Sequence, residues 1–259
     1  MTRHNLKEMT RRRDVKLGHL VMEFATPGIG HILKAAGCDF AFLDLEHSGF
    51  GYETAKSALR YFEAAALPTL VRVPAKDYQF IARACDIGAE GIMVPMVGTA
   101  AEAQAIVRAM KYVPAGARGV ALGIAHDNFA SRPAESAMAE ANARTTLFCL
   151  IETAEGVTNA DEIAAVDGVD CLWIGHFDLS SSLGIPGQFG HPRFLDAVGT
   201  IVAAAKRHDK SLGRLVLSVE EGARLFGEGF DFCCYSGDVW VLRDALGSAV
   251  SRLREACKP

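Results

Sequence analysis

The sequence predicts an α/β protein built as a single (β/α)8 TIM barrel, and three observations lead to that fold class. Apolar runs rich in β-branched residues alternate with longer, Ala-rich runs that have helical apolar spacing. The alternation gives eight strand–helix units in 259 residues, a usual length for one closed barrel. No linker and no shift in composition divides the chain, so we expect residues 1–259 to form one domain.

The expected strands and helices follow one another in regular alternation. Such alternation favours right-handed βαβ units and a parallel sheet, and eight units favour a closed barrel over an open sheet. The expected strands are Leu17–Phe24, Asp39–Leu45, Thr69–Val73, Gly91–Pro95, Thr146–Glu152, Asp170–Gly175, Leu212–Leu217 and Phe230–Tyr235. The segments with helical spacing include Tyr52–Ala66, Asp77–Ile87, Ala100–Lys111, Ala154–Ala164, Pro192–His208 and Val219–Gly227.

Glycine marks the expected turns from helices back into strands. Gly37, Gly88, Gly168 and Gly229 each stand just before a strand, where a helix C-cap and a short turn favour glycine. The longest irregular stretch, Tyr112–Asn142, separates the fourth and fifth strands and is rich in Gly, Ala and Pro. We expect this stretch to form a lid at the face of the barrel where active sites lie.

Composition and charge exclude several classes of protein. The net charge is −4 and the hydrophobic share is 50%, which is ordinary globular usage and gives no electrostatic support for a nucleic-acid or membrane partner. No apolar stretch reaches the length of a membrane span, and the N-terminus lacks the apolar region of a signal peptide. The seven cysteines show no CxxC spacing, so we expect reduced thiols in a cytoplasmic protein.

Polar side chains gather at the ends of four expected strands, where a barrel builds its active site. These residues are Asp44, Glu46, His47, Arg72, Glu152 and the run Gly175-His176-Phe177-Asp178. A single acid at such a position is equally well explained as a helix N-cap. A histidine, an arginine and two acids at neighbouring strand ends indicate chemistry instead. Lys34, Lys56, Lys76 and Lys111 fall on expected helices or their starts, so we expect no Schiff-base lysine.

Glu152 and Asp178 follow consecutive strands, which lie about 4.8 Å apart in a sheet. The two carboxylates can therefore converge on one cation. Two carboxylates, with water and substrate oxygens in the remaining positions, suit Mg²⁺, Mn²⁺ or Co²⁺ better than a closed zinc site. Asp44 and Glu46 share one face of their strand. They hold either metal-bound waters or Arg72, or they form a purely structural salt-bridge pair.

Six blocks of sequence, in order along nearly the whole chain, resemble one enzyme family. The blocks are FLDLEH (Phe42–His47), VRVP (Val71–Pro74), DIGAEGIMVPMV (Asp86–Val97), YVPAGARGV (Tyr112–Val120), IETAEGV (Ile151–Val157) and GVDCLWIGHFDLS (Gly168–Ser180). They resemble the HpcH/HpaI aldolases, the metal-dependent class II pyruvate aldolases with a barrel of the phosphoenolpyruvate/pyruvate superfamily. The resemblance implies reversible cleavage of a 4-hydroxy-2-oxo acid into pyruvate and an aldehyde. It also implies a homohexamer assembled as a trimer of dimers.

The resemblance also implies a role for individual residues. Glu152 and Asp178 match the metal ligands. Arg72 matches the arginine that stabilises the enolate oxygen of pyruvate, and His47 matches the general base, which works through a water. Asp86 matches an acid that orients this histidine from a neighbouring subunit. The set suits the reaction, because an enolate needs a Lewis acid and a fixed guanidinium, and the 4-hydroxyl proton needs a base.

The chain departs from the family pattern beside the substrate. Gly175 stands where a backbone group contacts pyruvate. Leu150 replaces a common glutamine two residues before the ligand glutamate, and is either part of the substrate pocket or a core residue. His176 and Phe177 replace a common Pro-Ala before the ligand aspartate. His176 is either an extra catalytic or ligand residue, or a histidine that forms the pocket wall or bonds to the backbone. Together with Arg72 and Asp178, these are the expected substrate-binding residues. They do not identify the aldehyde substrate.

Two other interpretations are weighed against the aldolase. A CoA-ester lyase of the wider superfamily also uses acidic metal ligands, but it needs a basic cluster for the CoA phosphates, and none follows the run Arg11-Arg12-Arg13. A catalytically silent barrel used for binding is the second, and the retained histidine, arginine and acids argue against it. The apolar helix expected over Trp240–Leu253 either packs on a neighbouring subunit or caps its own barrel.

Overall fold

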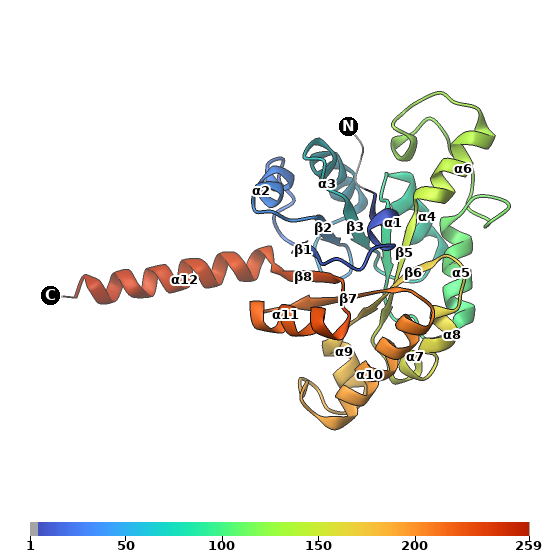
Figure 1. Ribbon diagram of the computed structural model, residues 1–259. Coiled ribbons are helices and arrows are strands. Elements are labelled where there is room, and N and C mark those ends of the chain that lie inside the picture. Colours follow the sequence, from blue (N-terminus) through green and yellow to red (C-terminus); the bar gives the residue numbers. More distant parts are fainter. Residues whose placement is uncertain (1–4, 259) are drawn as a thin grey trace.

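Eight parallel strands close into a barrel in the computed structural model, which describes residues 5–258. Each strand pairs with the next along the chain, and the eighth pairs with the first (Figure 1). The strands are β1 (Lys16–Val21), β2 (Phe40–Asp44), β3 (Thr69–Arg72), β4 (Gly91–Val94), β5 (Thr146–Ile151), β6 (Val169–Ile174), β7 (Ser211–Val216) and β8 (Phe232–Gly237). The predicted fold class is confirmed, and every predicted strand is present with its ends within three residues of the expected bounds.

Helices pack around most of the barrel and lead each of the first seven strands back to the start of the next (Figure 1). They are α1 (Leu6–Met9), α2 (Ile29–Ala35), α3 (Tyr52–Ala64), α4 (Tyr78–Asp86), α5 (Ala100–Met110), α6 (Ala134–Arg144), α7 (Ala154–Thr158), α8 (Ala160–Ala164), α9 (His176–Ser182), α10 (Pro192–Arg207), α11 (Val219–Glu228) and α12 (Asp238–Ala256), with a 3-10 turn η1 (Ala125–Asp127). The four glycines predicted before strands all have positive φ, between 89° and 110°, as helix ends of this kind require.

Side chains alternate between the inside of the barrel and the layer beneath the helices. The interior is aromatic at its middle, where the rings of Phe148 and Phe232 lie 5.3 Å apart and those of Phe42 and Trp173 lie 5.7 Å apart. Leu6 of α1 joins this interior cluster, so α1 closes the end of the barrel where the strands begin. The polar side chains lie at the other end of the barrel, where the strands finish.

Two expectations about local structure are wrong. The helix expected over Ala154–Ala164 is broken at Asn159, whose side chain donates a hydrogen bond to the Gly98 carbonyl oxygen, and it forms α7 and α8. The stretch Tyr112–Asn142 contains η1 and most of α6. It also joins the end of α5 to the start of β5, so it lies at the amino end of the strands. Within one chain it is therefore no lid over the strand ends that carry the polar residues.

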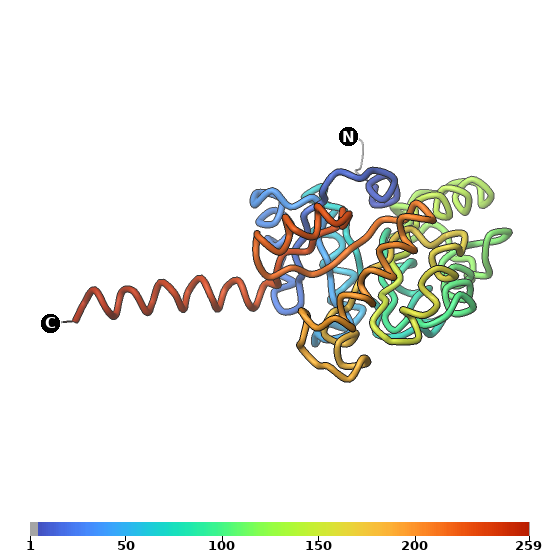
Figure 2. Tube along the Cα trace, turned by 60° about the horizontal axis from the view of Figure 1, so that its bottom comes forward, coloured from blue at the N-terminus to red at the C-terminus, as the bar shows by residue number. Residues whose placement is uncertain are grey.

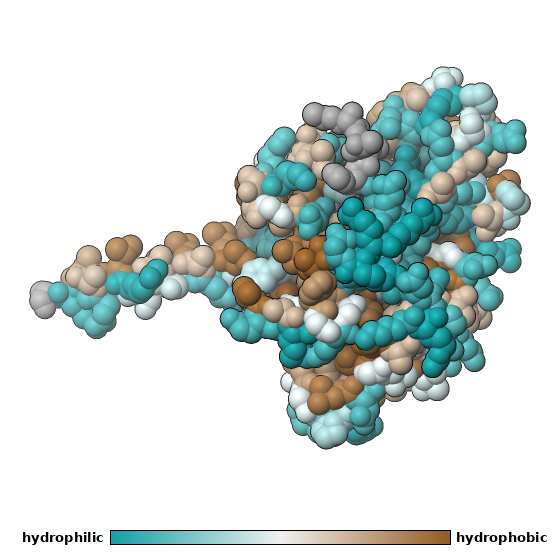
Figure 3. Space-filling view, viewed as in Figure 1, coloured by the Kyte–Doolittle hydropathy of each residue, from teal (hydrophilic) through white to brown (hydrophobic). Residues whose placement is uncertain are grey.

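The last helix, α12, leaves the barrel and points into solvent (Figures 1 and 2). It is tied at its base by Asp238, whose carboxylate accepts hydrogen bonds from the backbone N–H groups of Met22, Glu23 and Phe24. Apolar side chains line one edge of the helix and polar side chains line the other (Figure 3). Among residues 5–258, no helix combines the length and the apolar character that crossing a membrane requires.

Candidate active site

Arg72, at the end of β3, is held by two acids that follow β2. Asp44 is fully buried and accepts two hydrogen bonds from the guanidinium, from Nε at 2.8 Å and from Nη2 at 2.7 Å. Glu46 lies 3.2 Å from Nη1. Burial opposes the charge of Arg72, but the bonds to Asp44 and the nearby carboxylates outweigh it, so the pKa of Arg72 is raised. Both acids therefore contact Arg72, which fits a supporting role at the site and a structural salt bridge alike.

His47 lies just beyond this network and faces solvent. Its side chain is 58% exposed, and Nε2 is 3.8 Å from a carboxylate oxygen of Glu46. Its backbone N–H donates to Asp44. The turn after β2 therefore places the histidine beside the arginine network with its imidazole exposed to solvent. A base at this position is accessible to a water or to a substrate hydroxyl.

Glu152 follows β5 and points into the end of the barrel. The residue is 3% exposed, and its carboxylate accepts a 2.7 Å hydrogen bond from the backbone N–H of Met96. Gly175, at the end of β6, leaves the space that this carboxylate occupies, because a Cβ there would lie 2.3 Å from Glu152 Oε2. Glycine at position 175 is thus a condition for the observed place of the glutamate.

Three carboxylates act on one another at this end of the barrel. Burial raises the pKa of Glu152 to about 7, and the charges of Glu46 and Asp178 add to the effect. Burial likewise raises the pKa of Glu46. Asp178 stands in the first turn of α9 and is exposed. The structure therefore brings Glu152, Asp178, Arg72 and His47 to one end of the barrel, as the sequence predicts.

The residues present fit a divalent cation bound through few protein ligands. Burial and mutual repulsion make the charged form of these carboxylates unfavourable. A cation between Glu152 and Asp178 would offset this cost. Over residues 5–258, no group of three or more His, Cys, Asp or Glu side chains is arranged as a metal cage. A site with two carboxylates leaves its other positions to water and substrate, which is the arrangement Mg²⁺ favours.

Asp86 does not meet His47 within one chain. It is the last residue of α4, so it lies at the amino end of the strands, and it accepts hydrogen bonds from Nε and Nη2 of Arg118. The guanidinium of Arg118 also stacks over the ring of Tyr112, 4.5 Å from its centroid. A role beside the histidine is open to Asp86 only across a subunit boundary, as the family resemblance implies.

The three residues that depart from the family pattern have different environments. Leu150 is 2% exposed and belongs to the interior cluster of the barrel, on the strand face that carries Glu152. His176 is buried against the ring of Phe189, with ring centroids 5.0 Å apart. Burial and the charge of Arg214 lower the pKa of His176 to about 4, which keeps the ring neutral. Phe177 is 54% exposed beside Asp178.

Sequence reasoning missed the segment that supports Glu152. Met96 has φ +57°, a left-handed conformation that is uncommon for a residue with a side chain. Lys76 donates a 3.0 Å hydrogen bond to the Met96 carbonyl oxygen. No pattern in the sequence marks a backbone N–H as a partner of a side chain, so this contact could not be found without the fold.

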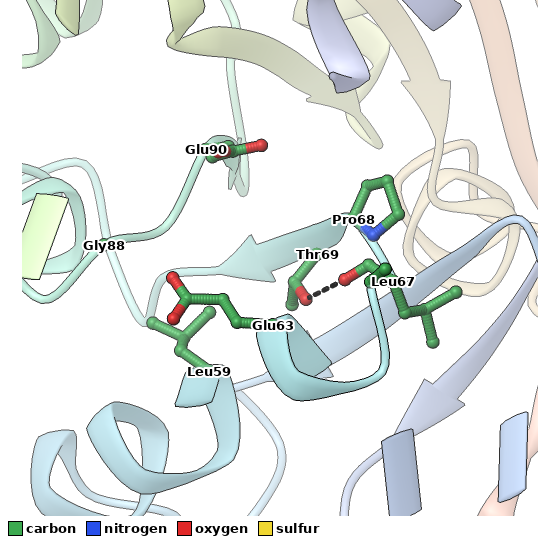
Figure 4. A pocket seen from close by; sticks show the side chains of 8 residues that line it. Leu59, Glu63, Leu67, Pro68, Thr69, Gly88 and Glu90 are labelled. Carbon is green, nitrogen blue, oxygen red and sulfur yellow. Dashed lines mark hydrogen bonds between the residues drawn. The ribbon is translucent and has the colours of Figure 1, made fainter. Parts of the chain in front are cut away.

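A small cavity lies elsewhere, between α3 and the starts of β3 and β4 (Figure 4). Its volume is about 30 Å³, enough for a water molecule or two. The Thr69 hydroxyl, which donates to the Leu67 carbonyl oxygen, and the Glu63 carboxylate lie at its wall. The cavity is at the opposite end of the barrel from the strand-end residues and is too small for a substrate.

A closed parallel barrel with charged side chains converging where its strands end is characteristic of a (β/α)8-barrel enzyme. The model of the HpcH/HpaI aldolase/citrate lyase family matches residues 21–245. The chain belongs to this family, and it is a carbon–carbon lyase of the aldolase type. The predicted family and enzyme class are confirmed.

Three relatives illustrate the similarity. The 5-keto-4-deoxy-D-glucarate aldolase of Citrobacter koseri is 34% identical over 235 residues, 90% of this chain and 89% of the relative. The hydroxypyruvate/pyruvate aldolase of Chromohalobacter salexigens is 34% identical over 233 residues, 89% and 91% of the two chains. The crystal structure of an HpcH/HpaI aldolase from Desulfitobacterium hafniense superposes with a TM-score of 0.91 at 30% identity, covering 97% of each chain.

Proposed function

We propose that this chain is a divalent-metal-dependent aldolase that cleaves a 4-hydroxy-2-oxo acid to pyruvate and an aldehyde, and catalyses the reverse reaction. The observation that carries the proposal is the fixed guanidinium of Arg72 at the same strand ends as Glu152 and Asp178. An enolate formed there meets a cationic group that needs no reorganisation. A relative named for pyruvate and hydroxypyruvate supports pyruvate as the donor.

Each residue has one task in this proposal. Glu152 and Asp178 would hold the metal ion, which would supply Lewis-acid stabilisation of negative charge on the substrate. Arg72, aligned by Asp44, donates hydrogen bonds to the enolate oxygen. His47 accepts the proton of the 4-hydroxyl group through a water as the C3–C4 bond breaks, and delivery of a proton to the enolate carbon then gives pyruvate. The reverse reaction runs these proton transfers backwards. The backbone at Gly175 and the side chains of Leu150, His176 and Phe177 line the binding site of the pyruvate donor.

Chelation tests the proposal directly. Pyruvate release from a 4-hydroxy-2-oxo acid should stop after dialysis against a chelator and return with Mg²⁺, Mn²⁺ or Co²⁺. Glu152→Gln keeps the shape of the side chain and removes its charge, so added metal should not restore its activity. Full activity in metal-free wild-type enzyme would contradict the proposed role of the ion.

The outward faces of β1 and β8, between α2 and α11, are not covered by a helix of the described chain, and we call this surface the slot. Between α2 and α11, the outward side chains of Leu17 on β1 and Tyr235 on β8 are 47% and 43% exposed. On the apolar edge of α12, Leu242 and Leu246 are 54% and 58% exposed on the same chain. We propose that two subunits exchange these helices, each filling the slot of the other, since both surfaces are apolar and unpaired.

Such dimers are the proposed building blocks of the hexamer that the family resemblance implies. In the hexamer, we propose that Asp86 approaches His47 of an adjacent subunit. We further propose that residues 1–259 act as one domain in the cytoplasm. The seven cysteines are all free, which agrees with a reducing compartment.

A further inference from the structure

The connection from β4 to α5 runs beside the carboxylate of Glu152. Met96, two residues beyond β4, donates its backbone N–H to Glu152 Oε1 at 2.7 Å. To do so it adopts the left-handed conformation, with φ +57°. A residue with a side chain keeps this conformation only where its surroundings over-determine it. Other contacts must therefore hold the peptide groups on either side of Met96.

Lys76 provides that constraint from the preceding loop. Its ammonium donates to the Met96 carbonyl oxygen at 3.0 Å and forms an ion pair with Glu102, in the first turn of α5. The other carboxylate oxygen of Glu102 accepts a 2.7 Å hydrogen bond from the Gly98 N–H. One ammonium and one carboxylate thus hold both ends of the left-handed turn.

The turn is also pinned from the barrel side. The N–H of Val97 donates to the Leu150 carbonyl oxygen at 3.2 Å, and the Gly98 carbonyl accepts from Asn159 at 2.7 Å. These bonds fix where the turn lies. Lys76 holds the carbonyl side of the peptide that follows Met96, and Val97 holds its N–H side. Together these two bonds set the orientation of the peptide, and with it the direction of the Met96 N–H toward Glu152.

We propose that Lys76 is a positioning residue for the metal site: through Met96 it fixes the orientation of the Glu152 carboxylate. The inference rests on the proposed role of Glu152 as a metal ligand. Groups that orient a ligand typically change metal affinity by about 10- to 100-fold when removed. Lys76 acts one bond further out, so we expect the lower end of that range.

Binding of Mn²⁺, measured by isothermal titration calorimetry on the full chain, tests the inference without relying on turnover. Lys76→Met keeps the length of the side chain and removes its charge and donors. It should raise the Kd for Mn²⁺ roughly tenfold. Lys76→Arg retains donors and charge and should stay within about threefold of wild type. Lys56→Met, an exposed lysine on α3, is the matched control and should leave the Kd unchanged.

Other variants separate the possible outcomes. Glu102→Gln loosens the far end of the same link and should weaken Mn²⁺ binding by about threefold, so it carries the test should Lys76→Met fail to fold. Glu152→Gln should abolish binding in the site. An unchanged Kd in folded Lys76→Met, or an equal loss in Lys56→Met, overturns the positioning role alone. Wild-type protein that binds no Mn²⁺ at Glu152 overturns the proposed function as well.

Discussion

At the scale of single residues, the candidate site depends on buried charges that are paired. Asp44 has no exposed surface, and burial alone would raise its pKa, yet the pKa is lowered because Arg72 donates two hydrogen bonds to it. Leaving one member of such a pair alone in the interior costs several kcal/mol. The pair therefore fixes the guanidinium before any substrate binds, which is what stabilising a developing enolate requires.

The first prediction concerns His47. His47→Ala should lower kcat for retro-aldol cleavage by roughly 10²–10⁴-fold, the usual effect of losing a general base. The side chain is largely exposed and makes no buried contact, so the melting temperature should hardly change. Steady-state kinetics and thermal melts on the same preparation check both parts. A wild-type kcat would rule out the assigned role.

The second prediction concerns Leu150, which is either packing or recognition. If the leucine borders the donor, Leu150→Gln should shift the preference from 2-oxobutyrate toward pyruvate by up to about tenfold in kcat/KM. If it is only a core residue, the buried amide should destabilise the fold by about 1–3 kcal/mol and leave the donor ratio unchanged. Because Leu150 is only 2% exposed, we expect some loss of stability in either case. The donor ratio is therefore the deciding measurement.

At the scale of elements, the amino end of the barrel is organised by the segment that follows α5. Lys111 is 6% exposed and donates to the carbonyl oxygens of Asn142 and Thr145. These bonds tie the end of α5 to the end of α6, across the long connection. Both acceptors are neutral, so no direct carboxylate partner offsets the cost of burying the ammonium group. Burial lowers the pKa of Lys111 to about 8.

The third prediction follows from the sign of this shift. The folded state releases the Lys111 proton near pH 8, whereas the unfolded chain retains it to about 10.4. Between these values the unfolded state binds more protons, so stability rises with pH. The unfolding free energy of the wild type minus that of Lys111→Met should rise by about 2 kcal/mol from pH 7.5 to 9.5. Urea titrations at both pH values measure it, and a constant difference would contradict the assigned pKa.

At the scale of the whole molecule, the described chain leaves two apolar surfaces uncovered. One edge of α12 and the slot between α2 and α11 both expose large side chains (Figure 3). A (β/α)8 barrel ordinarily covers β8 and β1 with its own last helix. Here that helix extends into solvent, so covering the slot falls to another molecule in the proposed dimer.

The fourth prediction tests the exchange of α12. Leu246→Asp places a charge in the middle of the apolar edge and should shift the protein from its oligomer to monomers, as seen by size-exclusion chromatography with light scattering. Activity should fall with it if Asp86 acts across subunits. Ser248→Asp adds the same charge about 200° around the helix and is the matched control. Unchanged mass in Leu246→Asp would show that α12 is not part of the interface.

The sequence by itself determined the eight strands, their parallel order and the strand-end acids. Each of these follows from local periodicity and from the rule that parallel strands finish at one end of a sheet. Tertiary structure alone decided that Tyr112–Asn142 lies at the other end and that Asp44 clamps Arg72. It also decided that Met96 supports Glu152 and that α12 leaves the barrel. These features depend on which distant groups meet in space, and residue periodicity carries information only about neighbours along the chain.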